Sequence, residues 1–146
     1  MTPILLTFFG GFSWATTVAA PTITASQSYS LYENAADDYP MGTVLFTGNT
    51  PTNMRFSASS SYLSADDYYY CSFNDPNLGQ MLLRLIPSAT RGAGFAAGGP
   101  TNYGVQMSAD GGKTWSASVN VAVSVTAAAA AAQQNRSLNI SLSLNI

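Results

Sequence analysis

The sequence contains no histidine and only one cysteine, Cys71, in 146 residues. Histidine is the usual general base of enzymes and a common zinc ligand, so its absence excludes the Ser-His-Asp hydrolases and the commonest zinc sites. A single cysteine cannot form a disulfide within the chain. Because Cys71 follows three tyrosines in a strand-like run, we expect it to be a small, buried, apolar residue.

Charged side chains are also scarce. They make up 8% of the residues, against roughly a quarter in an ordinary soluble domain. The five basic residues are spread along the chain and form no patch for phosphates, so we expect no nucleic-acid partner. A surface with so little charge does little to keep copies of a protein apart, which favours a subunit of an assembly. A secreted protein with a Ser/Thr/Asn surface is the alternative.

Residues 1–21 form an apolar segment that does not fit a membrane span. The run Ile4–Phe12 is too short for a bilayer, and glycine, serine and threonine interrupt the segment. Small residues near Ala20 would suit signal-peptide cleavage, but no basic residue follows Met1. We expect an N-terminal arm that contacts neighbouring subunits or fills an edge of its own domain. The aromatic contact residues of this arm are Phe8, Phe9, Phe12 and Trp14.

Residues 22–126 have the composition of a β domain, with runs of Val, Thr, Tyr and Ile between Gly, Pro, Asn and Asp. In Ser116–Val125 small apolar and polar residues alternate, which predicts a half-buried strand of an antiparallel sheet. Asn74–Gly79 predicts a hairpin turn, and the glycine-rich Arg91–Pro100 predicts a flexible loop. Eight strands separated by turns predict a β-sandwich. The expected strands are Thr22–Ala25, Tyr29–Glu33, Gly42–Thr47, Met54–Ser59, Tyr68–Phe73, Gln80–Ile86, Tyr103–Ser108 and Trp115–Val125.

Residues 127–146 are expected to form an alanine-rich linker followed by an amphipathic strand. The alanines after Thr126 favour either a short helix or an extended linker. Every second side chain in residues 137–146 is apolar, so a single strand register places five of them on one face. The strand is expected either to complete its own sheet or to add to the sheet of a neighbouring subunit. Its apolar contact residues are Leu138, Ile140, Leu142, Leu144 and Ile146.

The segment SADGGKTW, residues 108–115, resembles the Asp-box motif Ser-x-Asp-x-Gly-x-Thr-Trp, with Ser108, Asp110, Gly112, Thr114 and Trp115 at its defined positions. An aspartate in a turn accepts hydrogen bonds from turn amides, and glycine permits positive φ. In sialidase-like propellers the motif usually recurs once per blade, away from the active site, and 146 residues are too few for such a propeller. The resemblance implies a rigid hairpin with the tryptophan packed under the turn, and no catalytic role.

Residues 22–126 are similar to a cadherin-like domain. In Ile23–Gly48 a strand ends in Glu-Asn, a loop follows, and Gly-Thr-Val opens the next strand, as in that family. The resemblance implies an immunoglobulin-like, antiparallel Greek-key β-sandwich. It does not imply calcium, because one or two carboxylates do not supply the roughly six to eight oxygen ligands that calcium takes. The remaining paired aspartates are expected to be solvated loop charges: Asp37, Asp38, Asp66 and Asp67.

No residue pattern indicates a catalytic site, a cofactor or a metal. A glycosidase needs two opposed carboxylates, and the sequence singles out no pair. The segments DDYYYC and AGFAAGGPTNY suit a sugar or peptide, although packing is the default role of their tyrosines. We expect a non-enzymatic structural subunit of a symmetric particle, such as a phage or virus capsid decoration (cement) protein that contacts its own copies and a major capsid protein in the virion. A secreted or cell-surface cadherin-like adhesion or pilus module is the alternative, and an Asp-box glycan-acting protein is least favoured.

Overall fold

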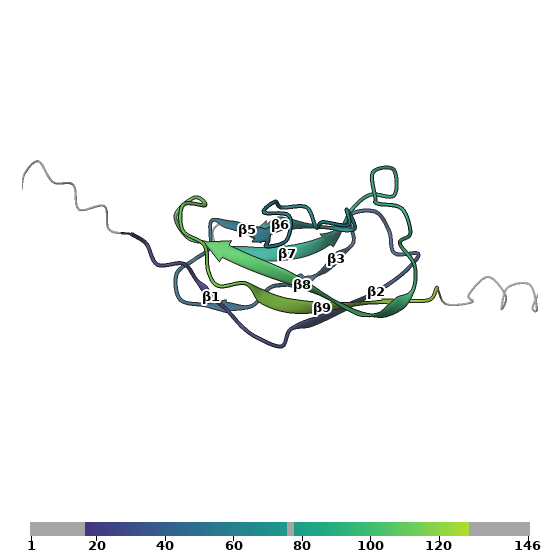
Figure 1. Ribbon diagram of the computed structural model, residues 1–146, viewed down its shortest axis with the longest axis horizontal. Helices are drawn as coiled ribbons and strands as arrows, with labels where there is room; N and C mark the ends of the chain where they lie inside the picture. The colour runs from purple at the N-terminus through teal and green to yellow at the C-terminus, as the bar shows by residue number, and fades with distance from the viewer. Residues whose placement is uncertain (1–16, 76–77, 129–146) are drawn as a thin grey trace, which may run out of the picture.

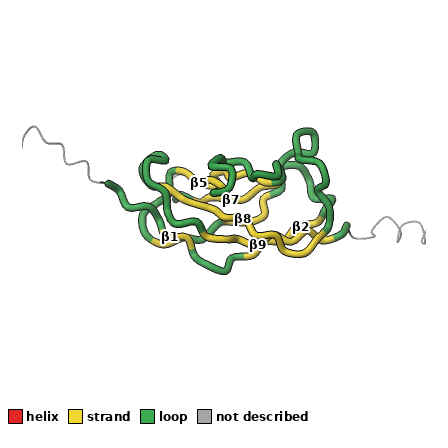
Figure 2. Tube along the Cα trace, in the orientation of Figure 1, coloured by secondary structure: helices red, strands yellow, loops and turns green. Residues whose placement is uncertain are grey.

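The computed structural model describes residues 17–75 and 78–128, which form an all-β domain without helices (Figures 1 and 2). The prediction of an all-β fold is therefore confirmed. The predicted contact residues of both arms lie outside the described residues. The strands are β1 (Thr22–Ile23), β2 (Ser28–Tyr32), β3 (Pro40–Thr43), β4 (Phe46–Thr47), β5 (Asn53–Phe56), β6 (Tyr69–Asp75), β7 (Gln80–Leu85), β8 (Gly98–Ser108) and β9 (Val119–Thr126).

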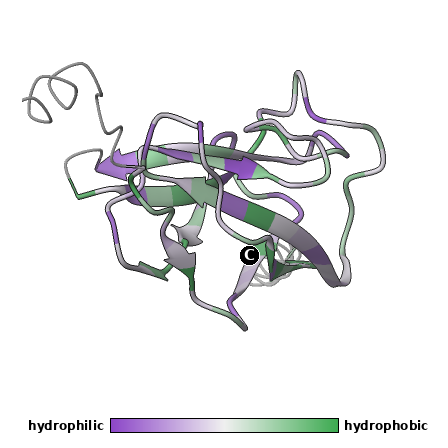
Figure 3. Cartoon of the chain, turned by 60° about the vertical axis from the view of Figure 1, so that its left-hand side comes forward, coloured by the Kyte–Doolittle hydropathy of each residue, from purple (hydrophilic) through white to green (hydrophobic). Residues whose placement is uncertain are grey.

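The strands form a four-stranded sheet, β2-β9-β8-β5, a three-stranded sheet, β3-β7-β6, and the short pair β1-β4. Apolar side chains from these sheets fill one core, as in a sandwich. Figure 3 shows hydrophobic and hydrophilic residues in alternating bands along the strands. The bands arise because successive side chains point to opposite faces of a sheet and one face packs on the core. The fully buried apolar residues include Val44, Leu83, Leu85, Val105, Met107 and Val121.

The four-stranded sheet is mixed rather than purely antiparallel. β2 runs parallel to β9, with Ser28 opposite Ala122 and Tyr32 opposite Thr126. A parallel pair needs a long connection, and here the rest of the domain separates the two strands in sequence. The prediction that every strand pairs antiparallel is therefore wrong for β2.

Several predicted strand boundaries are also wrong, and the starts of β8 and β9 differ most. β8 begins at Gly98 rather than Tyr103, because residues assigned to a loop pair with β9, Gly98 opposite Val125. β9 begins at Val119 rather than Trp115. Before it, Ser116 still bonds to β8: its amide donates to the Met107 carbonyl and its hydroxyl accepts from the Met107 amide, but no regular ladder forms.

Short segments outside the main ladders connect neighbouring parts of the domain at two places. At one place the Gln27 amide group donates to the carbonyls of Thr24 and Leu45 and accepts from the Leu45 amide at 2.7 Å. At the other place the carbonyl of Ser61 accepts from Phe56 in β5, and that of Tyr62 accepts from Cys71 in β6. Residues 61–62 therefore join the two sheets through backbone hydrogen bonds.

Cys71 lies in the core, as predicted, and is not in a disulfide. Burial raises the pKa of its thiol, because the charged thiolate is poorly solvated there. The residue is therefore a packing element with little thiolate character.

Candidate functional site

Residues 108–114 form a turn that is held by one hydroxyl and one carboxylate. The fully buried Ser108 donates to Asp110 Oδ1 at 2.7 Å and accepts from the Gly112 amide at 2.9 Å. Asp110 Oδ1 also accepts from the amides of Lys113 and Thr114, at 3.0 and 2.9 Å. The Ser108 hydroxyl and these amides lower the pKa of Asp110 from 3.8 to about 2.

Trp115 lies beside this turn and is half-buried. A Cβ on Gly112, which has a φ of 87°, would lie 3.2 Å from the indole ring. The guanidinium carbon of Arg55, in β5, lies 4.1 Å from the centroid of the indole ring, within the range of a cation–π contact. The five positions of the resemblance therefore lie together in one turn, with the tryptophan at the surface of the domain.

A second turn repeats the sequence Ser-Ala-Asp at residues 64–66. The buried Ser64 donates to Asp66 Oδ1 at 2.6 Å and accepts from the amides of Tyr68 and Tyr69, at 3.1 and 3.0 Å. Asp66 Oδ2 accepts from the Tyr103 hydroxyl at 2.6 Å. The shared Ser-x-Asp spacing is visible in the sequence, and it is the signal that reveals this second turn.

The expectation of solvated loop charges holds for the exposed Asp37, Asp38 and Asp67, and it is wrong for Asp66, which is partly buried and accepts hydrogen bonds through both oxygens. Asp37 forms an ion pair with Arg91 at 3.5 Å. Asp38 accepts from the Tyr70 hydroxyl at 2.7 Å. Asp67 is exposed. Sequence reasoning missed the partners Arg91, Tyr70 and Tyr103 because each is remote in the chain from its aspartate.

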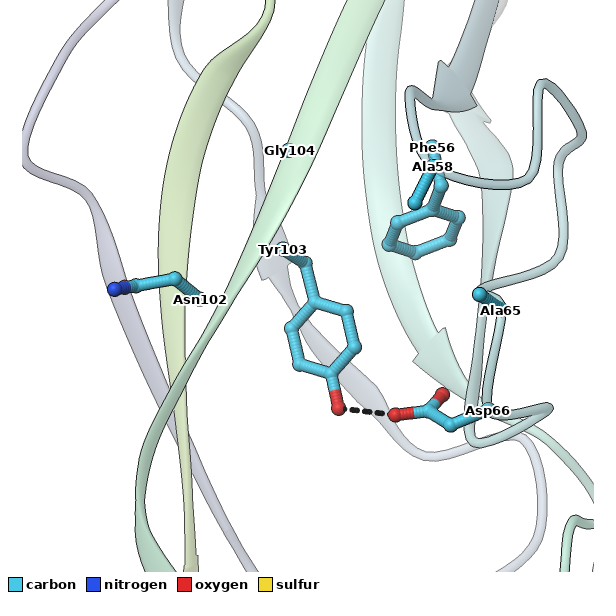
Figure 4. Close-up of a pocket in the computed structure, with 7 residues that line it drawn as sticks. All are labelled: Phe56, Ala58, Ala65, Asp66, Asn102, Tyr103 and Gly104. Carbon is cyan, nitrogen blue, oxygen red and sulfur yellow. Dashed lines mark hydrogen bonds between the residues drawn. The ribbon is translucent and has the colours of Figure 1, made fainter.

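A pocket of about 330 Å³ lies where β5 ends beside β8 (Figure 4). In Figure 4 the Tyr103 ring forms one wall and its hydroxyl points to Asp66, while the Asn102 side chain points away from the ring. Edge-to-face contacts hold this ring, with centroids 6.0 Å from Phe56 and 5.1 Å from Tyr69. The lining residues are Phe56, Ala58, Ala65, Asp66, Asn102, Tyr103 and Gly104.

No known family model and no curated protein matches this chain.

The chemistry of the pocket favours binding over proton transfer. Both oxygens of Asp66 already accept hydrogen bonds from the domain. Burial, and then the hydrogen bond to Asp66, raises the pKa of the Tyr103 phenol, so the phenol keeps its proton. Among the described residues no group of His, Cys, Asp and Glu side chains is suited to hold a metal ion, and no helix there is long and apolar enough to cross a membrane.

Proposed function

We propose that this chain is a non-enzymatic structural subunit of a symmetric particle, such as a capsid decoration protein of a phage or virus, located in the virion. One observation carries the proposal: the two ends of the described part of the chain lie at opposite ends of the long axis of the domain (Figure 1). The apolar segment 1–16 continues from one end, and the alanine-rich and amphipathic segment 129–146 continues from the other. Segments attached at opposite ends are placed to contact different neighbours, either copies of this chain or a major capsid protein.

The use of the carboxylates supports a non-enzymatic role. The sequence has seven Asp and Glu residues, and most of them accept hydrogen bonds from the domain itself. A carboxylate engaged in this way holds loops in place and is a poor general base. The residues concerned are Glu33, Asp37, Asp38, Asp66, Asp75 and Asp110.

We also infer that the fold is an immunoglobulin-like, cadherin-like Greek-key sandwich. The strand order β2-β9-β8-β5 against β3-β7-β6 corresponds to the two-sheet arrangement of immunoglobulin-like domains. The same topology favours the alternative function, a secreted or cell-surface adhesion module. N-terminal sequencing of the mature protein distinguishes the two, because an exported module is expected to start near Ala20 or Pro21.

Multi-angle light scattering tests the proposal on three proteins: the full chain, a chain that ends at Ala128 and a chain that begins at Thr17. We expect the full chain to assemble, and both truncated chains to stay folded, by circular dichroism, and to assemble less. A full chain that is monomeric at every concentration, with both termini resistant to protease, would refute the proposal.

A further inference from the structure

Part of β8 has a strand on one side only. β5 pairs with β8 between Val105 and Ser108, and the last backbone bond between these segments joins the Ser57 amide to the Gly104 carbonyl at 2.8 Å. Gly98 and residues 101–104 pair with β9 on the other side, with a register shift between Gly98 and Thr101. Among the described residues no strand pairs with the β5 side of residues 98–103. We call the β5 side of residues 98–103 the open edge.

The open edge presents unpaired backbone groups to a further strand. Because the Gly104 carbonyl faces the β5 side, strand alternation places both backbone groups of Asn102 on the same side. Residues 98–102 are exposed. Backbone groups at an exposed edge are a template for an added strand.

The pocket of Figure 4 lies along the open edge. Asn102, Tyr103 and Gly104 form one wall, and Ala58 and Ala65 line the other side. A strand added to an edge places alternate side chains in such pockets, which supplies specificity. An apolar side chain above Asp66 would not leave that carboxylate without partners, because both of its oxygens already accept hydrogen bonds.

We propose that residues 137–146 of a second copy of this chain add to the open edge as an antiparallel strand and place one leucine or isoleucine in the pocket. The inference rests on the proposed function and names the surface that receives the C-terminal segment. Apolar residues alternate throughout 137–146, and this segment is long enough to cover residues 98–103. Neither stretch contains a charged residue, so pairing buries no unpaired charge.

The direction of β9 favours a second copy over the same chain. Val125, near the end of β9, lies opposite Gly98, at the start of β8. A C-terminal segment folding back from that end of its own domain would run parallel to β8. A segment from another copy has no such restriction and can pair antiparallel, which is the more stable ladder.

Disulfide trapping between two differently tagged copies tests the pairing. One copy carries Asn102→Cys, and the other carries Ser137→Cys, Asn139→Cys, Ser141→Cys or Ser143→Cys in turn. We expect a disulfide between differently tagged copies for at least one position. The unmodified chain is the control, because its Cys71 is buried. A single chain carrying both cysteines that forms only an internal disulfide would overturn the inference in favour of its own tail.

Filling the pocket provides a test that uses no cross-link. Ala65→Phe places a ring in the pocket, and Ala117→Phe makes the same change at an exposed alanine outside it. We expect Ala65→Phe to weaken self-association at least tenfold, by sedimentation equilibrium, and Ala117→Phe to leave it unchanged. Both variants are checked for folding by thermal unfolding.

The outcomes separate this inference from the proposed function. If the full chain assembles but Ala65→Phe assembles equally well and no cross-link between copies forms, the inference is wrong and the proposed function stands. If the full chain does not assemble at all, the proposed function fails and the inference fails with it.

Discussion

Two buried serines organise the loops of this domain. The hydroxyls of Ser64 and Ser108 each donate to the carboxylate two residues later and accept from backbone amides of the same turn. Buried amides without an acceptor are costly, so each serine stabilises the fold although it lies outside the apolar core.

We predict that Ser64→Ala lowers the free energy of unfolding by about 1–3 kcal/mol, because the Tyr69 amide loses its side-chain acceptor and the Tyr68 amide loses one of two. Urea denaturation measures the change. Ser30→Ala on the exposed face of β2 is the matched control and should change stability by less than about 0.5 kcal/mol. Equal losses in both variants would show that the Ser64 hydroxyl has no special role.

The lowered pKa of Asp110 predicts a stability change in acid. Its folded pKa of about 2 lies below the ordinary 3.8, so ionised Asp110 stabilises the folded state above 3.8, and this contribution disappears as the pH falls through 2. We expect Asp110→Asn to lower the melting temperature at neutral pH. Its difference from the unmodified protein should shrink between about pH 4 and pH 2, measured by thermal unfolding. A difference that is constant over this range would contradict the assignment.

At the level of strands, local sequence patterns predict the strands well and their interruptions poorly. The run predicted as Gln80–Ile86 is observed as Gln80–Leu85, because its apolar residues pack on both sides. The single strand predicted over Gly42–Thr47 is instead split into β3 and β4. The interruption depends on a residue far away in the sequence, because the Leu45 amide donates to the Gln27 side chain instead of to a carbonyl of a neighbouring strand.

The candidate site was only partly predictable for the same reason. The turn at residues 108–115 is formed by residues close in sequence, so the spacing of Ser108, Asp110 and Gly112 predicts its hydrogen bonds. The pocket joins Asp66, in the turn before β6, to Tyr103 in β8, and these residues are remote from each other in the sequence. The start of β8 at Gly98 was missed because glycine and proline disfavour strands, and here pairing with β9 overrides that preference.

Gly92, in the loop before β8, tests the packing of that loop, and Gly99, in β8, is the matched control. A methyl group at Gly92 would overlap the backbone carbonyl of Asp66, whereas one at Gly99 would have no atom within 4 Å. We predict that Gly92→Ala destabilises the domain by about 1–3 kcal/mol or more. Gly99→Ala should be neutral or stabilising by up to about 1 kcal/mol, because alanine restricts the unfolded chain. Chemical denaturation compares them, and a tolerated Gly92→Ala would show that the loop lies farther from Asp66.

For the whole molecule, charged side chains are few, and most of the carboxylates among them accept hydrogen bonds within the domain. The net charge is −2, and the carboxylates mostly serve loops of their own domain. Little charge remains to steer a partner or to repel a second copy. Association of such a chain is expected to depend on apolar contacts and backbone pairing.

This expectation leads to a prediction about salt. If copies associate through the open edge and residues 137–146, no charged side chains attract each other across the contact. Screening by salt should then hardly change the affinity. We predict that the dissociation constant for self-association changes by less than about threefold between roughly 50 and 500 mM sodium chloride. Sedimentation equilibrium of the full chain measures it, with Asn102→Lys plus Ser141→Lys as a comparison. The two added lysines place like charges on the proposed partners, so association of this variant should be weak in low salt and recover as salt rises. A steep loss of affinity with salt in the unmodified chain would instead assign assembly to charged groups outside the open edge.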